Sequence, residues 1–117
     1  MKINATVNDL WERAQLEVRR EQSRGVRNPL KNSSFFLTNA GYYIEQAMLG
    51  VEERRGMVAE YAGKHEKFYD ADNPDALLCS IDRNSFWNHV LDLVLDSRSL
   101  ARFENSYSDY LWELISY

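Results

Sequence analysis

One segment constrains the fold of this chain more than any other: residues 85–96 are apolar around most of a helix's circumference. At about 100° per residue, this segment leaves only a narrow polar strip, formed by Asn88, Asp92 and Asp96. A helix that is apolar on several sides has to be covered by neighbours on those sides. We therefore expect it to be the central core helix. Its apolar residues are Phe86, Trp87, Val90, Leu91, Leu93, Val94 and Leu95.

The two ends of the chain each predict an amphipathic helix. Near the N-terminus, Thr6 and Asp9 approximate a capping box, and Gly25 is a natural stop. At the other end, residues 99–116 repeat apolar residues at helical spacing. The first stripe is Val7, Leu10, Trp11, Ala14 and Val18, and the last is Leu100, Phe103, Tyr107, Leu111 and Leu114.

A further helix is expected to follow two good N-cap residues, Ser33 and Ser34, and to run to Val51. It has a second apolar stripe on its opposite side, so it lies between neighbours or faces a partner, including a second copy of the chain. Residues 35–45 also fit a β-hairpin with a three-residue turn. We prefer the helix because its main stripe continues past that hairpin. The second stripe is Phe35, Tyr42 and Leu49.

Residues 51–69 fit one more helix, with His65 in the middle of its apolar stripe. Small residues share another face of this helix, where they would allow a second helix to approach closely. After the break at 70–74, residues 75–81 form a short apolar turn or helix. The small residues are Gly56, Ala59 and Gly63.

These segments predict an all-α fold, a compact and irregular bundle of about five helices. The chain has 117 residues, a length that fits one domain, so we expect a single helical domain over 1–117. Its two breaks, 25–34 and 70–74, contain proline and turn-forming residues but are too short for interdomain linkers.

The composition excludes several classes of protein. No stretch approaches 18 consecutive apolar residues, which argues against a membrane span, and charged residues follow the start too soon for a signal peptide. The single cysteine, Cys79, excludes an internal disulfide, and its apolar neighbours favour a buried, inert thiol. A reducing cytoplasm is the simplest expectation for the location.

Signatures of catalysis are missing from the sequence. There is no phosphate-binding glycine loop, no nucleophile elbow and no zinc-protease motif. The nearest approach to a metal site is the group Glu60, His65, Glu66 and Asp70, but paired Glu-x-x-His motifs are absent. We expect His65 to be a core or boundary residue. The prediction is a non-enzymatic protein with no metal and no cofactor.

Charge is distributed unevenly along the chain, although the net charge is only −4. Acidic and aromatic residues are concentrated in the C-terminal half, where Trp112 points about 140° away from the apolar stripe. Tyr and Trp anchor interfaces, and surrounding carboxylates attract a basic partner. The predicted contact residues are Asp92, Asp96, Asp109, Trp112 and Glu113.

Basic residues are concentrated at the N-terminus, which suggests a nucleic-acid contact as the alternative. The candidate residues are Arg13, Arg20, Arg24, Arg27 and Lys31. Neighbouring glutamates at helical spacing pair these charges, and the chain as a whole is acidic, so we consider nucleic acid an unlikely ligand.

The function expected from the sequence is therefore that of a small binding protein. It docks an acidic, aromatic surface on a basic partner protein, such as a toxin or nuclease, and inhibits or regulates it. Immunity proteins, antitoxins and counter-defence proteins act in this way, and the analogy rests on size and charge alone.

Overall fold

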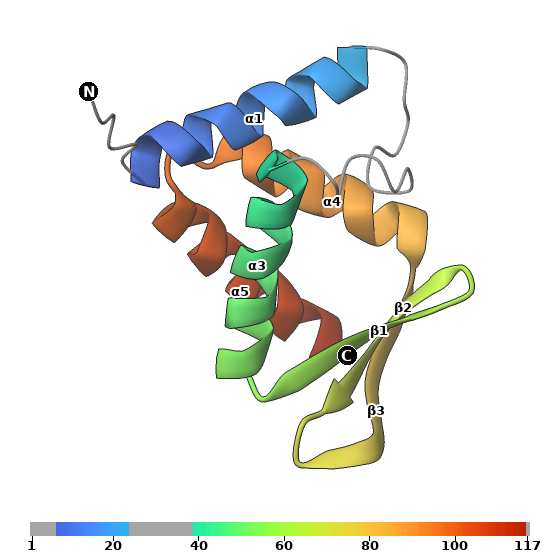
Figure 1. Cartoon of the computed structure of the whole chain (residues 1–117). Coiled ribbons are helices and arrows are strands. Elements are labelled where there is room, and N and C mark those ends of the chain that lie inside the picture. The colour runs from blue at the N-terminus through green and yellow to red at the C-terminus, as the bar shows by residue number, and fades with distance from the viewer. Residues whose placement is uncertain (1–6, 24–38, 117) are drawn as a thin grey trace.

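The computed structural model describes residues 7–23 and 39–116 of the chain. This part contains four helices and one three-stranded antiparallel sheet, in the strand order β1-β2-β3 (Figure 1). The helices are α1 (Val7–Ser23), α3 (Asn39–Arg54), α4 (Arg83–Asp96) and α5 (Leu100–Ile115). The strands are β1 (Met57–Ala62), β2 (His65–Asp70) and β3 (Asn73–Asp82). The fold is α+β, so the prediction of an all-α bundle of about five helices is wrong.

Two glycines explain why residues 51–69 do not form one helix. Gly56 has a φ of +69° just after α3, and its N–H donates to the Glu53 carbonyl at 3.0 Å, as in a glycine that ends a helix. Gly63 has a φ of +64° and takes the first central position of the two-residue turn between β1 and β2, as a type II′ hairpin turn requires. The predicted helical stripe is therefore interrupted twice. His65 becomes the exposed first residue of β2 and not a core residue.

The remaining sequence predictions divide between helix and strand. The helices predicted at 85–96 and 99–116 are confirmed as α4 and α5. The helix that we preferred to a hairpin at 35–45 is confirmed for 39–45, which belong to α3, whereas 35–38 lie outside the described residues. Residues 75–81, predicted as a short turn or helix, belong to β3.

Capping side chains explain where the last two helices begin. Asp82 precedes α4, and its Oδ2 accepts the backbone N–H of Ser85 at 3.0 Å. Ser99 precedes α5, and its Oγ accepts the backbone N–H of Arg102 at 3.2 Å. Both contacts satisfy donors that the first turn of a helix leaves free. In the described part of the chain, no helix is long and apolar enough to cross a membrane.

Alternation along the strands decides which face of the sheet is covered. On the inner face, Phe68 is fully buried and pairs with the half-buried Cys79. On the outer face, Val58, Tyr69 and Leu77 are partners across the three strands, and Val58 and Leu77 are 53% and 50% exposed. One face of the sheet therefore packs on the helices, while the other presents an apolar row to solvent.

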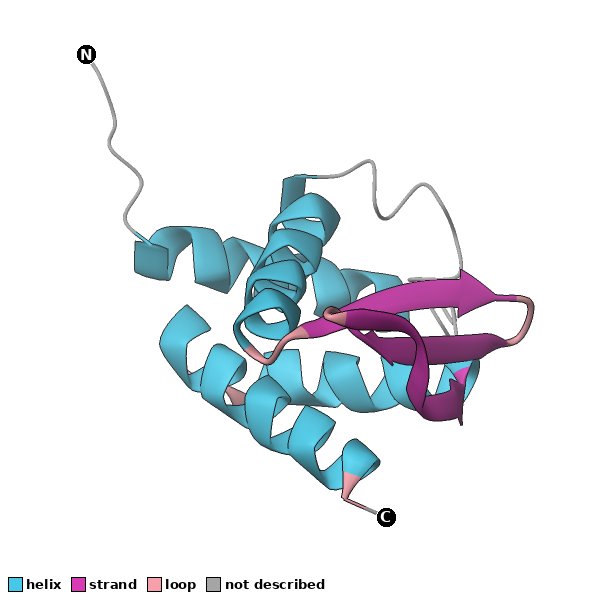
Figure 2. Ribbon diagram, turned by 90° about the horizontal axis from the view of Figure 1, so that it is seen from below, coloured by secondary structure: helices cyan, strands magenta, loops and turns pink. Residues whose placement is uncertain are grey.

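The core extends from the helices to the inner face of the sheet. In Figure 2 the strands lie together at one end of the helical group, so the core has a helical side and a sheet side. The Trp11 and Phe103 rings are 5.2 Å apart on the helical side, and Tyr107 lies 6.0 Å from Phe103 and 6.2 Å from Phe86. The central role of α4 is confirmed by its buried residues, which are Phe86, Trp87, Val90, Leu91 and Val94.

Candidate functional site

All five predicted contact residues lie on α4 and α5, which pack side by side, and four of them are acidic. Asp92 and Asp96 are exposed on α4, and Asp109 and Glu113 are exposed on α5. A ring contact between the two helices, at 3.9 Å, holds them together beside these carboxylates. We call the four residues the α4–α5 acidic face. The stacked rings are those of His89 and Tyr110.

Helical spacing places the acidic residues around that ring contact. Asp92 follows His89 by three residues on α4, while Asp109 and Glu113 lie on either side of Tyr110 in the sequence of α5. The Asp96 end of the face is less acidic, because Asp96 lines a shallow depression together with two arginines. These arginines are Arg98 and Arg102.

Trp112, the fifth predicted residue, lies on a different flank of α5. It is 55% exposed, and the Arg55 guanidinium carbon lies 4.9 Å from the centre of its ring. Arg55 is also held to α5 by its Nε, which donates to the Ser108 Oγ at 2.6 Å. A cation over an indole face is stabilising. The structure therefore brings Trp112 next to the end of α3 and not next to Asp92 and Asp96.

The residues of the nucleic-acid alternative are only partly described. Arg13 and Arg20 are exposed on α1, and Arg20 forms an ion pair with Glu17 at 3.0 Å. The other three, Arg24, Arg27 and Lys31, lie outside the described residues.

The residues considered as a metal site do not come together. Because 57–70 is a hairpin, Glu60 and His65 are exposed, while Glu66 points to the inner side of the sheet. Within residues 7–23 and 39–116, no group of three or more His, Cys, Asp and Glu side chains is placed to hold a metal ion.

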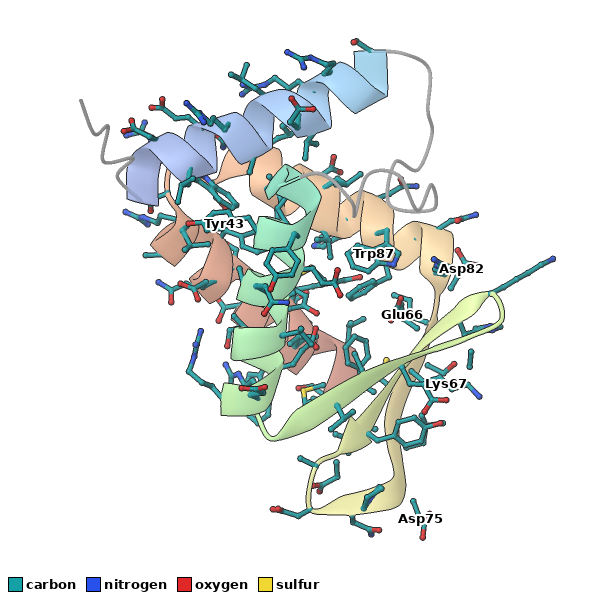
Figure 3. All side chains as sticks on the ribbon, in the orientation of Figure 1. Tyr43, Glu66, Lys67, Asp75, Asp82 and Trp87 are labelled. Atoms are coloured by element: carbon teal, nitrogen blue, oxygen red, sulfur yellow. The ribbon has the colours of Figure 1, made fainter. Side chains whose placement is uncertain are left out.

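The most unusual chemistry in the molecule is a pair of buried carboxyl groups that sequence reasoning missed. Glu52 on α3 is 4% exposed and accepts a hydrogen bond of 2.6 Å from the Tyr107 hydroxyl of α5. Glu66 on β2 is 3% exposed and accepts one of 3.0 Å from the Trp87 indole N–H of α4. Figure 3 shows Glu66 and Trp87 between the sheet and α4. Four elements are thus joined by two carboxyl groups.

Burial raises the pKa of both carboxyl groups to about 7, from an ordinary value of 4.5. Loss of solvation is the main cause for each. The hydrogen bonds from Tyr107 and Trp87 lower the two pKa values again, and Arg83 has the same effect on Glu66. The Glu52 charge raises the pKa of Glu66, and the same charge helps burial to raise that of Tyr107. The two groups therefore interact electrostatically, and each takes up or releases a proton near neutral pH.

Both carboxyl groups line one pocket of about 110 Å³ between α3, the sheet and α4. The rest of its wall is mainly apolar and aromatic, with one further carboxylate, Glu45, on α3. A pocket of this kind can take up or release protons and can accommodate a cation. The apolar and aromatic residues of the wall are Met48, Leu49, Ala59, Phe86 and Trp87.

Comparison of the chain with protein-family models, curated proteins and solved structures finds no match. The function therefore has to be argued from the surfaces and sites of this molecule.

A signal for the missed pair is present in the sequence. Glu52 follows Ile44 and Met48 at intervals of four residues, so it continues the buried stripe of α3. Glu66 alternates with Phe68 in β2, so it shares the buried face of the strand. A charged residue within an apolar stripe indicates a buried ionisable group.

Proposed function

We propose that this protein is a non-enzymatic binding protein that docks its α4–α5 acidic face on a basic partner protein. One observation carries the proposal: four exposed carboxylates lie on two neighbouring helices that are fixed against each other. The His89–Tyr110 contact lies among them, and the Phe86 and Tyr110 rings stack at 5.9 Å behind it. A rigid surface loses little conformational entropy when a partner binds.

The partner that fits this surface is a protein with a basic cleft or patch. Carboxylates speed the association of a basic partner and repel an acidic one. Nucleases and other nucleic-acid enzymes have such basic clefts, so an inhibitor of the immunity, antitoxin or counter-defence type is the proposed class. Trp112 lies outside the acidic face and is not part of this contact in the proposal.

The test uses a partner captured from the native host, identified and purified. The double variant Asp92→Lys with Asp109→Lys reverses two charges on the acidic face. We expect at least about a tenfold loss of affinity for that partner, with an unchanged helical signal in circular dichroism. Raising the salt concentration is expected to weaken binding of the natural chain, because exposed charges are screened.

A matched control has the same change in net charge elsewhere. Glu12 on α1 and Asp75 on β3 are exposed and belong to neither α4 nor α5, and Figure 3 shows Asp75 at the end of the sheet. The variant Glu12→Lys with Asp75→Lys should keep most of the affinity. Equal losses in both double variants would indicate a nonspecific effect of charge, and no loss in either would remove the acidic face from the contact. A mobility shift with nucleic acid at low salt would favour the alternative, since nonspecific binding is strongest there.

A further inference from the structure

The pocket between α3, the sheet and α4 has features of a ligand site that the acidic face does not share. Its volume of about 110 Å³ is of the same order as engineered cavities of ~150 Å³ that take up benzene. By this comparison it has space for about four or five non-hydrogen atoms. Carboxyl groups line one part of the wall, while Met48, Leu49 and Ala59 line another. Such a wall suits a ligand with a charged end and an aliphatic end.

The two buried carboxyl groups are only partly bonded. Within the described residues, Tyr107 is the one hydrogen-bond partner of Glu52, and it contacts a single oxygen, Oε2. Likewise, the Glu66 carboxyl has one hydrogen-bond partner among the described residues, the Trp87 indole, which contacts Oε1. No described donor bonds to the second oxygen of either carboxyl group, and neither oxygen is a fully enclosed unpaired atom, so both are open to the pocket that the two residues line.

Negative charge is in excess around the pocket. Glu45, Glu52 and Glu66 line it, and Glu53 adds to the negative potential at Glu52. Among the described residues, the positive charge that acts on the pair is that of Arg83, which lowers the pKa of Glu66. Burying two neighbouring carboxylates with so little positive charge is unfavourable, so the site favours either a bound proton or a bound cation.

We propose that this pocket binds an alkylammonium group, with its N–H donors on Glu52 and Glu66 and its alkyl chain against Met48, Leu49 and Ala59. An ammonium group provides three donors, enough for both free carboxyl oxygens. The Trp87 and Phe86 rings in the wall add a favourable surface for a cation. A divalent metal ion fits less well, because Glu45, Glu52 and Glu66 line the pocket but no three such side chains among the described residues are placed to hold a metal ion.

This site is separate from the α4–α5 acidic face. Helix α4 turns Phe86 and Trp87 to the pocket, while Asp92 is about 140° around the helix from Trp87. The inference therefore goes beyond the proposed function and does not depend on it. The ammonium group can belong to a free amine or to a lysine side chain of another protein, since the chemistry is the same.

Proton exchange gives the site a measurable signature. With carboxyl pKa values of about 7, part of the pair is protonated at neutral pH, and an ammonium group has to displace a proton. Binding that displaces one proton should be about tenfold tighter at pH 8 than at pH 6. The nearby groups that titrate or carry charge are Glu45 and Glu53 of α3, Arg83 of α4 and Tyr107 of α5.

The experiment titrates the full chain with n-butylammonium and follows the indole N–H signals by NMR. We expect a saturable shift of the Trp87 signal, because its N–H is bonded to Glu66. The neutral analogue n-butanol should leave it unchanged. The variant Glu66→Gln keeps the shape of the side chain but removes its charge, and should weaken butylammonium binding about tenfold. Its matched control is Glu60→Gln, an exposed glutamate of β1, which should bind as the natural chain does.

A second variant keeps the proposal testable if Glu66→Gln fails to fold. Ala59→Leu fills the pocket without changing either carboxyl group, and it should abolish the shift. Binding of a lysine-containing peptide as well as butylammonium would assign the site to lysine side chains, whereas binding of butylammonium alone would assign it to small amines. The proposal would be overturned if butylammonium caused no saturable shift of the Trp87 signal, or if butanol shifted it equally. It would also be overturned if both pocket variants bound butylammonium with unchanged affinity.

Discussion

The helical side and the sheet side of the core bury polar groups in opposite ways. On the helical side, the Trp11 indole N–H donates to the Ser97 carbonyl at 2.8 Å, and the Gln15 amide donates to the Val94 and Ser97 carbonyls at 2.8 and 2.6 Å. All of these groups are neutral. On the sheet side, the buried polar groups are the carboxyls of Glu52 and Glu66, whose charge depends on pH.

Tyr107 belongs to both sides and makes the comparison direct. Its ring lies parallel to that of Phe103, with an interplanar angle of 1°, and its hydroxyl donates to Glu52. We therefore expect the stability of the helical side to be constant with pH, and the stability of the sheet side to change with pH. Substitutions on each side should therefore separate the two behaviours.

The largest effect is expected on the helical side. Phe103 is fully buried against Trp11 and Tyr107, so Phe103→Ala should lower the free energy of unfolding by about 3–5 kcal/mol. The loss should be the same at pH 5 and pH 8, as measured by urea unfolding. Leu16→Ala is the control, because Leu16 is 55% exposed and should lose less than about 0.5 kcal/mol. If the loss of unfolding free energy in Phe103→Ala varied strongly with pH, the stability of the helical side would not be independent of pH.

The double variant Glu52→Gln with Glu66→Gln tests the sheet side. Because the folded pKa values of about 7 lie above the ordinary 4.5, the folded state binds extra protons between these values. Stability from this source is complete below pH 4.5 and is lost as the pH rises through 7. We expect the natural chain to lose on the order of 5 kcal/mol between pH 5 and pH 8, about half of it from each carboxyl group.

The double variant should show little of this dependence in the same urea unfolding experiments, because neither amide titrates. Lys67→Gln is a useful control: Lys67 neighbours Glu66 on β2 but lies on the other face of the sheet, and this variant should keep the natural pH profile (Figure 3). A flat profile in the natural chain would show that the two carboxyl groups are not buried as described.

A smaller effect is expected from Tyr107→Phe, which removes only the hydroxyl. Glu52 then loses its hydrogen bond inside the core, so the free energy of unfolding should fall by about 1–3 kcal/mol. The loss should be greater at pH 8, where the carboxylate is charged, than at pH 5. Urea unfolding at the two pH values measures it, and an equal loss at both would mean that Tyr107 does not stabilise the charged form.

The sequence was sufficient for the helices because each of them repeats apolar residues over several turns. It was insufficient for the sheet because residues 51–69 also match a helical period, and a tertiary context decides between the two. The decisive local signals were Gly56 and Gly63, which we assigned to a helix face. In the structure they have positive φ and form a helix end and a hairpin turn.

The candidate sites show a similar limit. Helical spacing predicts the exposure of Asp92, Asp96, Asp109 and Glu113, whereas the packing of α4 against α5 through His89 and Tyr110 depends on tertiary structure. The Glu52–Glu66 pair joins α3 to β2, which no spacing within one element can reveal. Trp112 shows the converse case, since helical spacing predicts that it points away from the apolar stripe, but its neighbour, Arg55, comes from the turn after α3.

The smallest effect is expected on the outer face of the sheet, opposite the face on which Phe68 and Glu66 are buried. Leu77→Thr replaces a residue that is 50% exposed by one with a high β propensity, so the free energy of unfolding should change by less than about 0.5 kcal/mol at either pH. The matched change on the inner face, Phe68→Thr, should cost several-fold more, because Phe68 is fully buried. Urea unfolding of both variants compares the faces directly. A large loss from Leu77→Thr would mean that the row of Val58, Tyr69 and Leu77 is covered in the folded protein, and a contact between chains would then explain its apolar character.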